Sequence, residues 1–400
     1  MTAVDTLIHS HWIAPVEPAE TVYEHYSVAI HEGRILDILP TEQAHATYQA
    51  DIEHTLEGHL LIPGFINAHT HAAMTLLRGL ADDLPLHDWL NNHIWPAEGR
   101  WVNEEFVHDG TQLAMAEMLR SGTTCFNDMY FFPDVTARAA AACGMRASVG
   151  LILLDFPTVW AHEPDEYISK GLAVHDQYRS DPLITTLFAP HAPYTVSDAP
   201  LERVRVLADE LDIGIHMHVH ETAEEVDGAL AQTGKRPLQR LQSLGLLSPA
   251  MLAVHMTRLT DDEISLFAAG GGHVVHCPES NLKLASGLCP AHALSVAGIN
   301  VALGTDGAAS NNDLDMMGEM RTAALLGKAV SNNASALPAH VALEMATLNG
   351  ARALGIDADT GSLVKGKWAD IAAIHLDTIE TPVSYTHLRA HETYITISDS

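Results

Sequence analysis

The sequence alternates between two kinds of segment from about residue 60 to residue 305. Short apolar runs rich in β-branched residues each end in a polar residue, and an amphipathic stretch follows. Apolar runs of this length are typical of buried strands, whereas longer amphipathic stretches are typical of helices. The predicted strands are 60–68, 123–127, 146–153, 183–189, 213–219, 251–256, 273–277 and 301–305.

Helices are predicted between several of these runs. Three of them stop next to Gly122, Gly144 and Gly270, and a helix end favours a glycine because it can adopt the left-handed conformation. Eight β/α units over this length predict an α/β fold, a closed (β/α)8 or TIM barrel, rather than an open doubly wound sheet. No GxGxxG follows the first strand, which also disfavours a dinucleotide-binding sheet. The predicted helices are 103–121, 134–143, 198–211, 222–231 and 260–269.

The two flanks of this region have a different pattern. Residues 4–57 show short alternating segments with a Glu-Gly turn and no helical pattern, which indicates small antiparallel β structure. After helices predicted near 313–329 and 338–353, residues 361–375 return to the alternating style. We therefore predict that the two chain ends pair into one small β-sandwich beside the barrel.

The predicted domains leave a tail that does not belong to either. The sandwich takes 1–57 and 359–382, and the barrel takes 58–358. Residues 383–393 (VSYTHLRAHET) match one reading frame of a common DNA-sequencing adapter. We therefore interpret 383–400 as a non-native tail that truncates the sandwich, and we exclude its histidines and arginine from functional reasoning.

The charge balance narrows the classes of partner. The chain has 21 Lys+Arg against 51 Asp+Glu, a net charge of −30 at pH 7 with neutral histidines. Clustered Lys and Arg hold nucleic acids and anionic membranes, so neither is an expected partner. No signal peptide or membrane-length apolar run is seen, and the four cysteines form no CxxC pair. We expect a soluble, cytoplasmic protein.

Histidine is the unusual residue, with 26 in the chain. At that content chance alone predicts about two HxH pairs, so a bare HxH says little about metal binding. Four such pairs are present: His9/His11, His69/His71, His216/His218 and His218/His220. Their context must therefore decide which of them is functional.

Polar side chains at the predicted strand ends are candidates for one active site, because TIM-barrel catalytic residues project from the C-terminal ends of strands. His69 and His71 lie two apart on a strand, so both can face one metal ion. His218 and Asp306, at the ends of strands five and eight, can complete a three- or four-ligand set of the zinc type. Strand five holds three alternating histidines (HMHVH), and the spacing leaves the choice among them open. The other strand ends carry Asp128, His191, Glu221, His255 and His276.

Five motifs resemble those of the amidohydrolase superfamily: PGFINAHTH, HMHVHE, LAVH, HCPESNLKLASG and LGTDGAASNNDLDM. The likeness covers nearly the whole chain up to about residue 382. Within the superfamily, the sequence is most similar to the methylthioadenosine/S-adenosylhomocysteine deaminases, beside the triazine hydrolases. The superfamily match is highly specific, and the match to one subfamily is less so.

The resemblance implies a metal site with one ion. The family pattern places a ligand histidine three residues before a glutamate, which selects His218 and Glu221. Members with two ions use a carboxylated lysine at the end of strand four, and the run LITTLFAPHAPY has His191 there and no lysine. We therefore expect one divalent ion held by His69, His71, His218 and Asp306, namely Zn²⁺, with Fe²⁺ as the alternative.

The resemblance also implies a reaction. A bound ion would lower the pKa of water toward neutrality and make hydroxide available for attack on an amine-bearing ring carbon. Asp306 would take the proton of that water and His255 would orient the hydroxide. Glu221 would protonate the adjacent ring nitrogen, which prevents negative charge from accumulating. We expect a hydrolytic deaminase that converts 5′-methylthioadenosine to 5′-methylthioinosine and S-adenosylhomocysteine to S-inosylhomocysteine, with adenosine as a further substrate.

Specificity is expected from the loop after strand one, DWLNNHIWPAEGRW. Trp89 and Trp95 can wall an apolar pocket, although helix packing is an equal explanation for Trp95. The resemblance implies that Glu98 accepts hydrogen bonds from ribose hydroxyls and that His191 contacts the nucleoside. No arginine is placed to hold a homocysteine carboxylate. Weaker candidates are Ser280, Asn281, Lys283 and Ser310 on the later loops, with His276 behind the ligands.

Three alternatives compete with this interpretation. A related enzyme acting on guanine, 8-oxoguanine, a cytosine-like base or a triazine would have the same metal site, and only the loop with Glu98 favours a ribosylated purine. A metal-binding scaffold without catalysis is disfavoured because all six central residues are present. A deaminase acting on nucleic acid is disfavoured by the charge. The expected partner is a small nucleoside, and a homo-oligomer is an open expectation, since dimers and tetramers are common in such families.

Overall fold

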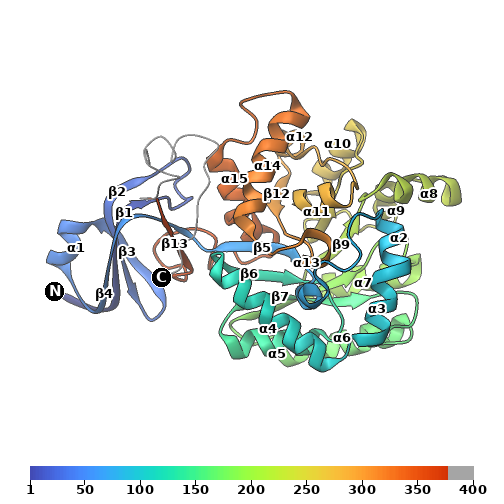
Figure 1. Cartoon of the computed structure of the whole chain (residues 1–400), viewed down its shortest axis with the longest axis horizontal. Coiled ribbons are helices and arrows are strands. Elements are labelled where there is room, and N and C mark those ends of the chain that lie inside the picture. The colour runs from blue at the N-terminus through green and yellow to red at the C-terminus, as the bar shows by residue number, and fades with distance from the viewer. Residues whose placement is uncertain (377–400) are drawn as a thin grey trace.

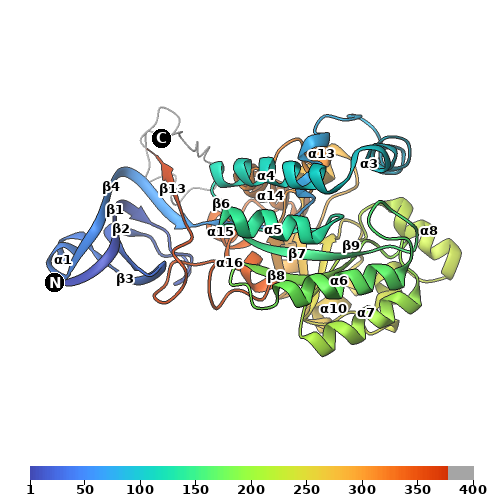
Figure 2. The ribbon, with the colours of Figure 1, turned by 90° about the horizontal axis from the view of Figure 1, so that it is seen from below.

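The computed structural model describes residues 1–376 and consists of a barrel with a smaller sheet at its side (Figures 1 and 2). Eight parallel strands follow one another in chain order around the barrel, which confirms the predicted TIM-barrel fold. The suspected adapter-derived tail and the end of the predicted sandwich lie outside the described residues. The barrel strands are β5 (Phe65–Thr70), β6 (Thr123–Asp128), β7 (Arg146–Leu153), β8 (Ile184–Pro190), β9 (Ile215–Val219), β10 (Met251–His255), β11 (His273–His276) and β12 (Asn300–Leu303).

Helices cover the outside of the barrel, and local sequence explains where several of them begin and end. The Asn103 side chain accepts a hydrogen bond from the Phe106 backbone N–H at 2.9 Å and so caps the first turn of α4. Thr260 and Glu263 form a capping box at the start of α10, and Gly144 ends α5 with φ 77°. The helices on the barrel are η1 (Ala72–Leu77), α2 (Leu86–Trp89), η2 (Leu90–Ile94), α3 (Trp95–Trp101), α4 (Glu104–Arg120), α5 (Pro133–Cys143), α6 (Pro164–Tyr178), α7 (Asp198–Leu211), α8 (Ala223–Thr233), α9 (Pro237–Ser243), α10 (Asp261–Gly270), α11 (Pro278–Lys283), α12 (Ala291–Val296), α13 (Ala308–Asn311), α14 (Met316–Ser331), α15 (Ala339–Ala346) and α16 (Leu348–Ala353).

The smaller sheet contains strands from both ends of the described chain, as predicted. Its order is β13-β4-β1-β2-β3, and it is mixed rather than antiparallel because β1 pairs parallel with β4. The prediction of no helix in residues 4–57 is wrong, since α1 (Thr41–Thr47) lies there. Only Ala44 of α1 is buried, and a helix of this length is too short to show a periodic apolar pattern. The strands are β1 (Thr2–Ile13), β2 (Tyr23–His31), β3 (Arg34–Pro40), β4 (Tyr48–Pro63) and β13 (Ile371–His375).

The apolar run 60–68 is divided between the two sheets. Its first part ends β4 of the smaller sheet, and after Gly64 the chain continues as β5 of the barrel. A Cβ atom at Gly64 would lie 2.2 Å from the Thr124 hydroxyl oxygen, so only glycine fits at this crossing. The run appears continuous in the sequence because both strands are buried there.

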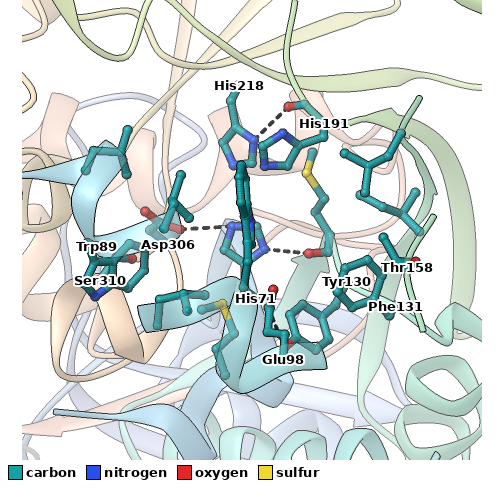
Figure 3. A pocket seen from close by; sticks show the side chains of 18 of the residues that line it. His71, Trp89, Glu98, Tyr130, Phe131, Thr158, His191, His218, Asp306 and Ser310 are labelled. Carbon is teal, nitrogen blue, oxygen red and sulfur yellow. Dashed lines mark hydrogen bonds and ion pairs between the residues drawn. The ribbon is translucent and has the colours of Figure 1, made fainter. Parts of the chain in front are cut away.

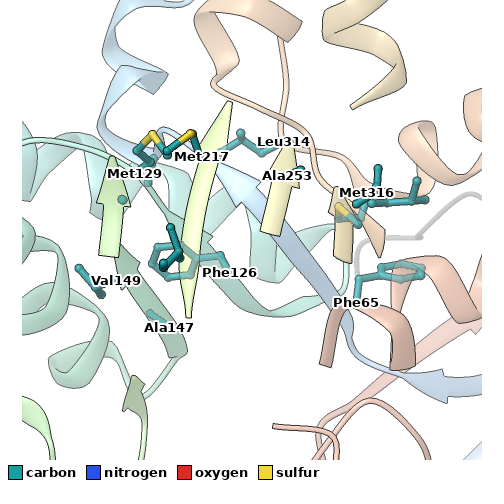
Figure 4. Close-up of a cluster of buried hydrophobic side chains, with 14 of the residues drawn as sticks. Phe65, Phe126, Met129, Ala147, Val149, Met217, Ala253, Leu314 and Met316 are labelled. Carbon is teal, nitrogen blue, oxygen red and sulfur yellow. The ribbon is translucent and has the colours of Figure 1, made fainter. Parts of the chain in front are cut away.

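The barrel is filled by apolar side chains. Every residue of β7 after Arg146 is buried, as expected for a parallel strand covered on both faces. Phe126, Val149 and Met217, from β6, β7 and β9, belong to the largest buried cluster, part of which is drawn in Figure 4. Among the described residues, no helix is long and apolar enough to cross a membrane.

The barrel closes between β12 and β5 through the residues that carry the candidate site. The Asp306 backbone N–H donates to the His69 carbonyl at 3.0 Å, and the Thr305 N–H donates to the Asn67 side chain at 3.0 Å. Gly304 makes this approach possible, because a Cβ there would lie 2.7 Å from the His69 backbone nitrogen. The closure holds His69 and Asp306 next to each other.

We expect Gly304→Ala to destabilise the protein by about 1–3 kcal/mol, because the added methyl group must push β12 away from β5. Urea denaturation measures this change. The control is Gly228→Ala in α8, where a Cβ meets nothing within 4 Å and alanine favours the helix. Equal midpoints for the two variants would contradict this account of the closure.

Candidate active site

A cavity of about 230 Å³ lies over the C-terminal ends of the barrel strands (Figure 3). Side chains from strand ends form its floor, and the segment from α2 to α3 covers it together with the loops after β6 and β7. Nine residues were predicted as site residues, and eight of them line this cavity: His71, Trp89, Glu98, His191, His218, Glu221, His255 and Asp306. The ninth, His69, is fully buried directly behind them.

The four predicted metal ligands converge on one point. Asp306 Oδ1 lies 3.4 Å from His69 Nε2 and 3.3 Å from His71 Nε2. His218 Nε2 lies 3.2 Å from His69 Nε2. A four-coordinate ion with bonds of ~2.0–2.2 Å places its ligand atoms at about these separations. The donor atoms of His69, His71 and His218, and those of His69, His255 and Asp306, form two groups within 4.8 Å.

Hydrogen bonds to the far side of the rings prepare these atoms for a metal. His71 Nδ1–H donates to the Met129 carbonyl at 2.5 Å, and His218 Nδ1–H donates to the His191 carbonyl at 2.8 Å. In a neutral ring this leaves the lone pair on Nε2, which faces the other ligands. His69 Nδ1 lies 2.9 Å from His216 Nε2, so His216 supports a ligand ring. The chemistry of this donor set fits a divalent ion of the zinc type.

The electrostatics of the metal-free site depend on Asp306. Burial lowers the pKa of His71, but its hydrogen bond and charge interaction with Asp306 outweigh burial and raise the pKa to about 9. Burial dominates at His69, whose pKa falls to about 4. Burial alone would raise the pKa of Asp306, yet the two histidines hold it well below its usual range. The site therefore contains an ionised carboxylate, Asp306, beside one protonated imidazole, His71, whose proton a metal would displace.

The backbone is strained at two of these strand ends. Asp306 has φ 63° and His255 has φ 74°, in the left-handed region that residues other than glycine adopt uncommonly, although asparagine, aspartate and histidine do so more often than the rest. Such conformations cost about 1–3 kcal/mol each and occur mainly at functional sites. At Asp306 the strain is accompanied by hydrogen bonds from Gly307 N–H at 2.8 Å to Oδ1 and from Ser280 at 2.7 Å to Oδ2.

Glu221 and His255 lie beside the metal ligands. His255 Nε2 is 3.7 Å from Glu221 Oε2, and His255 Nδ1 is 2.8 Å from Asn281 Oδ1. Ser286 donates to the other oxygen of Glu221 at 3.3 Å. Burial raises the pKa of Glu221, although the nearby histidines oppose the shift. A carboxyl group with a raised pKa, open to a cavity, can act as a general acid.

Glu98 is a second buried carboxyl group at a different part of the cavity (Figure 3). It comes from α3 and accepts a hydrogen bond of 2.8 Å from the Tyr130 hydroxyl. Burial raises its pKa to about 7, partly opposed by Tyr130. His191 Nδ1 is 3.0 Å from the Thr195 hydroxyl, and burial lowers its pKa to about 3. The His191 ring is therefore neutral at physiological pH.

The weaker candidates have different positions. Ser310 lines the cavity, and so does Trp95, which makes a ring contact with Phe156. Lys283 points elsewhere, to the Ala309 carbonyl at 3.0 Å and the Asp82 carboxylate at 2.7 Å. Asp128 accepts a hydrogen bond from the Ala72 N–H at 2.7 Å and so orients the turn after β5. His276 is buried and does not line the cavity.

Sequence reasoning missed several residues of the cavity. Tyr130, the partner of Glu98, lies two residues after the end of strand β6 at Asp128, and its position near a strand end was a usable signal. Ser286 does not line the cavity but contacts Glu221 from behind it, and it lies in a loop with no periodic pattern. Phe156, Thr158 and Val159 come from the irregular segment after β7 and gave no signal.

Comparison with known proteins gives a consistent picture. Residues 60–396 match the model of the amidohydrolase family. A 5-methylthioadenosine/S-adenosylhomocysteine deaminase of Saccharophagus degradans is 55% identical over 98% of this chain and 87% of its own length. The structure of an adenosine deaminase from Xanthomonas campestris with bound zinc is 53% identical, covers 98% of this chain and 90% of that one, and has a TM-score of 0.96.

A more distant structure shares the fold. Zinc-complexed atrazine chlorohydrolase of Arthrobacter aurescens TC1 has a TM-score of 0.89 at 23% identity, with 96% of this chain and 90% of that one covered. At this identity the likeness shows the barrel and its flanking sheet only. The family model covers the barrel and its strand-end motifs, and one relative matches almost the whole chain at more than half of its positions. The chain therefore belongs to the amidohydrolase family.

Proposed function

We propose that this protein is a hydrolytic deaminase of adenine nucleosides that carry a 5′-thioether, with adenosine as a further substrate. The observation that carries the proposal is the pairing of two sites in one cavity. At one end a four-ligand metal set lies beside the acid Glu221, and at another part the buried Glu98 is available for a ribose. The names of the Saccharophagus degradans and Xanthomonas campestris relatives support the same reaction class.

The proposed cofactor is one divalent ion, Zn²⁺, with Fe²⁺ as the alternative. His69, His71, His218 and Asp306 would hold it, since their donor atoms converge from β5 and the residue after it, from β9, and from the segment that follows β12. When bound, the ion supplies a hydroxide nucleophile at neutral pH by lowering the pKa of water. The zinc in the Xanthomonas campestris structure supports this choice of metal.

The side chains divide the proton transfers among them. Asp306, held ionised by its neighbours, accepts the proton of the attacking water. His255, with Nδ1 engaged by Asn281, uses Nε2, which lies 3.7 Å from Glu221 Oε2, to orient the attacking oxygen. Glu221 gives its proton to the ring nitrogen next to the carbon that is attacked. Asp306 or Glu221 then returns a proton to the leaving ammonia, so water and an adenine ring give a hypoxanthine ring and ammonia.

Glu98 and His191 would position the nucleoside. The ionised Glu98 carboxylate can accept hydrogen bonds from both ribose hydroxyls while Tyr130 holds one of its oxygens. The neutral His191 ring presents Nε2 toward the cavity, because Thr195 engages Nδ1. Trp89 contributes an apolar wall.

Ammonia release from metal-loaded protein tests the proposal, with 5′-methylthioadenosine, S-adenosylhomocysteine, adenosine and guanine compared side by side. Turnover of adenine nucleosides is the expected result. Turnover of guanine alone would preserve the mechanism and refute the nucleoside assignment. No turnover by a folded, metal-containing protein would refute the assignment of the reaction to these substrates.

The role of Glu98 predicts a pH dependence of substrate binding. Only the ionised carboxylate accepts two hydroxyl hydrogen bonds, so we expect the KM for nucleosides to fall as the pH rises through about 7. Glu98→Gln should have a higher KM without this step. KM measured between pH 5.5 and 8.5 checks both expectations, with Glu105→Gln on the exposed side of α4 as the control.

Glu98 should also affect stability with a defined sign. Its pKa in the folded protein lies above that of an exposed glutamate, so ionising it costs free energy only in the folded state. The folded state therefore loses stability from this residue as the pH rises from about 5 to about 7. Glu98→Gln should be more stable than the unaltered protein at pH 8, by up to ~3 kcal/mol, and equal to it at pH 4.5.

A further inference from the structure

We infer that this cavity selects nucleosides whose 5′-substituent is short and uncharged, and that it discriminates against a substituent ending in an amino acid. The inference rests on the proposed function and narrows it to 5′-methylthioadenosine over S-adenosylhomocysteine. Once the adenine ring reaches Glu221 and the ribose reaches Glu98, the 5′-substituent has only the remaining walls of the cavity to contact.

Those walls are apolar. Trp95 of α3 and Phe156 of the loop after β7 both line the cavity and contact each other, with ring centroids 5.9 Å apart. Figure 3 shows Phe131 and Thr158 on the side of the cavity away from Asp306 and Ser310. A thioether with a terminal methyl group gains from burial against such surfaces. The further apolar residues that line the cavity are Leu90, Ile94, Leu154 and Val159.

No lysine or arginine is among the residues that line the cavity within the described chain. The carboxyl groups that line it are Glu98, Glu221 and Asp306, and in their ionised form they repel the α-carboxylate of an amino-acid substituent. Lys283 precedes the lining residue Leu284, and Lys170 donates to the carbonyl of Trp160, which follows the lining residue Val159, but both lysines are engaged elsewhere. Lys283 pairs with Asp82 at 2.7 Å, and Lys170 pairs with Glu166 at 2.8 Å. A buried α-carboxylate would therefore have no counter-ion, and burial without one is strongly unfavourable.

The structure identifies one alternative path for a longer substituent. A second hollow of the molecule shares Phe156 and Tyr194 with the cavity and contains Lys235 and Arg240. Arg240 is engaged by Asp198 at 2.7 Å and by the Val196 carbonyl at 2.8 Å. Lys235 is therefore the cationic side chain of this hollow that could pair with the carboxylate of a long substituent. Tyr194 makes a ring contact with His87 at 6.1 Å, and together with Phe156 it stands between the two spaces.

The test compares kcat/KM for three nucleosides on the metal-loaded full chain. These are 5′-methylthioadenosine, S-adenosylhomocysteine and 5′-n-butylthioadenosine, which is long but uncharged. We expect S-adenosylhomocysteine to be poorer than 5′-methylthioadenosine by about 10²-fold, as for a charge left without its partner. The kcat/KM for the butylthio compound should stay within tenfold of that for 5′-methylthioadenosine, because the charge of the substituent and not its length causes the loss.

A variant supplies the missing cation. Val159 lines the cavity and is 38% exposed, so a longer side chain can be placed there without disturbing the core. Val159→Arg should raise kcat/KM for S-adenosylhomocysteine at least tenfold, and the matched control Val159→Met should not. Circular dichroism and metal content of both variants show whether they fold.

The outcomes separate the inference from the proposed function. Equal kcat/KM for 5′-methylthioadenosine and S-adenosylhomocysteine overturns the inference and leaves the function intact, and a selective loss of the second substrate in Lys235→Gln would then place its tail in the neighbouring hollow. If no nucleoside is turned over, the proposed function fails. Dissociation constants for the same compounds on Glu221→Gln then decide the inference, because equal affinities, or no binding at all, overturn it.

Discussion

Glu221→Gln is expected to lower kcat for an adenine nucleoside by 10²–10⁴-fold while the metal content stays that of the unaltered protein. Glutamine keeps the size of the side chain and can still receive the hydrogen bond from Ser286, but it carries no transferable proton. Negative charge would then accumulate on the ring as the nucleophile adds. Steady-state kinetics and metal analysis of the same preparation provide the two measurements.

The matched control is Asp227→Asn, an exposed acid on α8 close to Glu221 in sequence, which should leave kcat unchanged. Glu221 contacts His255 and lines the same cavity as the ligands His218 and Asp306, so its replacement could act through the metal. Metal content distinguishes the two explanations. A kcat of Glu221→Gln close to that of the unaltered protein would show that Glu221 has no role in the mechanism. A kcat that stays close to normal when His255 is replaced would show the same for His255.

Removal of the metal is expected to lower activity at least 10³-fold and to lower the melting temperature, and zinc should restore both. His69 lies on β5 and His71 directly after it, His218 lies on β9, and Asp306 lies in the segment that follows β12, so the bound ion connects separate strands of the barrel. An ion that binds only the folded protein at 1,000 times its Kd contributes about 4 kcal/mol of stability. Thermal denaturation before and after dialysis against a chelator measures this contribution.

Zinc binding should also release about one proton per ion at pH 7.5. In the metal-free protein Asp306 raises the pKa of His71 to about 9, so His71 is protonated there and must lose that proton to become a ligand. Titration calorimetry in two buffers of different ionisation enthalpy counts the protons. His218→Ala should lose tight binding and His162→Ala, an exposed histidine outside the site, should keep it. Tight zinc binding by His218→Ala would refute the ligand set.

Short-range patterns determined most of the barrel. Each β/α unit of the barrel repeats the alternation of an apolar run with an amphipathic stretch. Strand β7 has the predicted bounds, 146–153, because polar residues bound its apolar run. The spacing of His69 and His71 predicted that both rings reach one ion, and they do, although His71 lies directly after the last residue of β5. The short helix α1 was not predicted, because it buries only one residue and therefore has no periodic apolar pattern.

The sequence by itself determined which chemical groups stand at the strand ends, because strand position and side-chain direction are local properties. Tertiary structure decided which groups meet. Tyr130 and Glu98 are 32 residues apart and Ser286 and Glu221 are 65 apart, and no local pattern links such pairs. The same holds for the absence of a lysine or arginine from the cavity lining among residues 1–376, since its walls come from the segment α2–α3 and from loops after several strands. Which residues line a cavity depends on how distant loops pack, and this is settled only when the barrel closes.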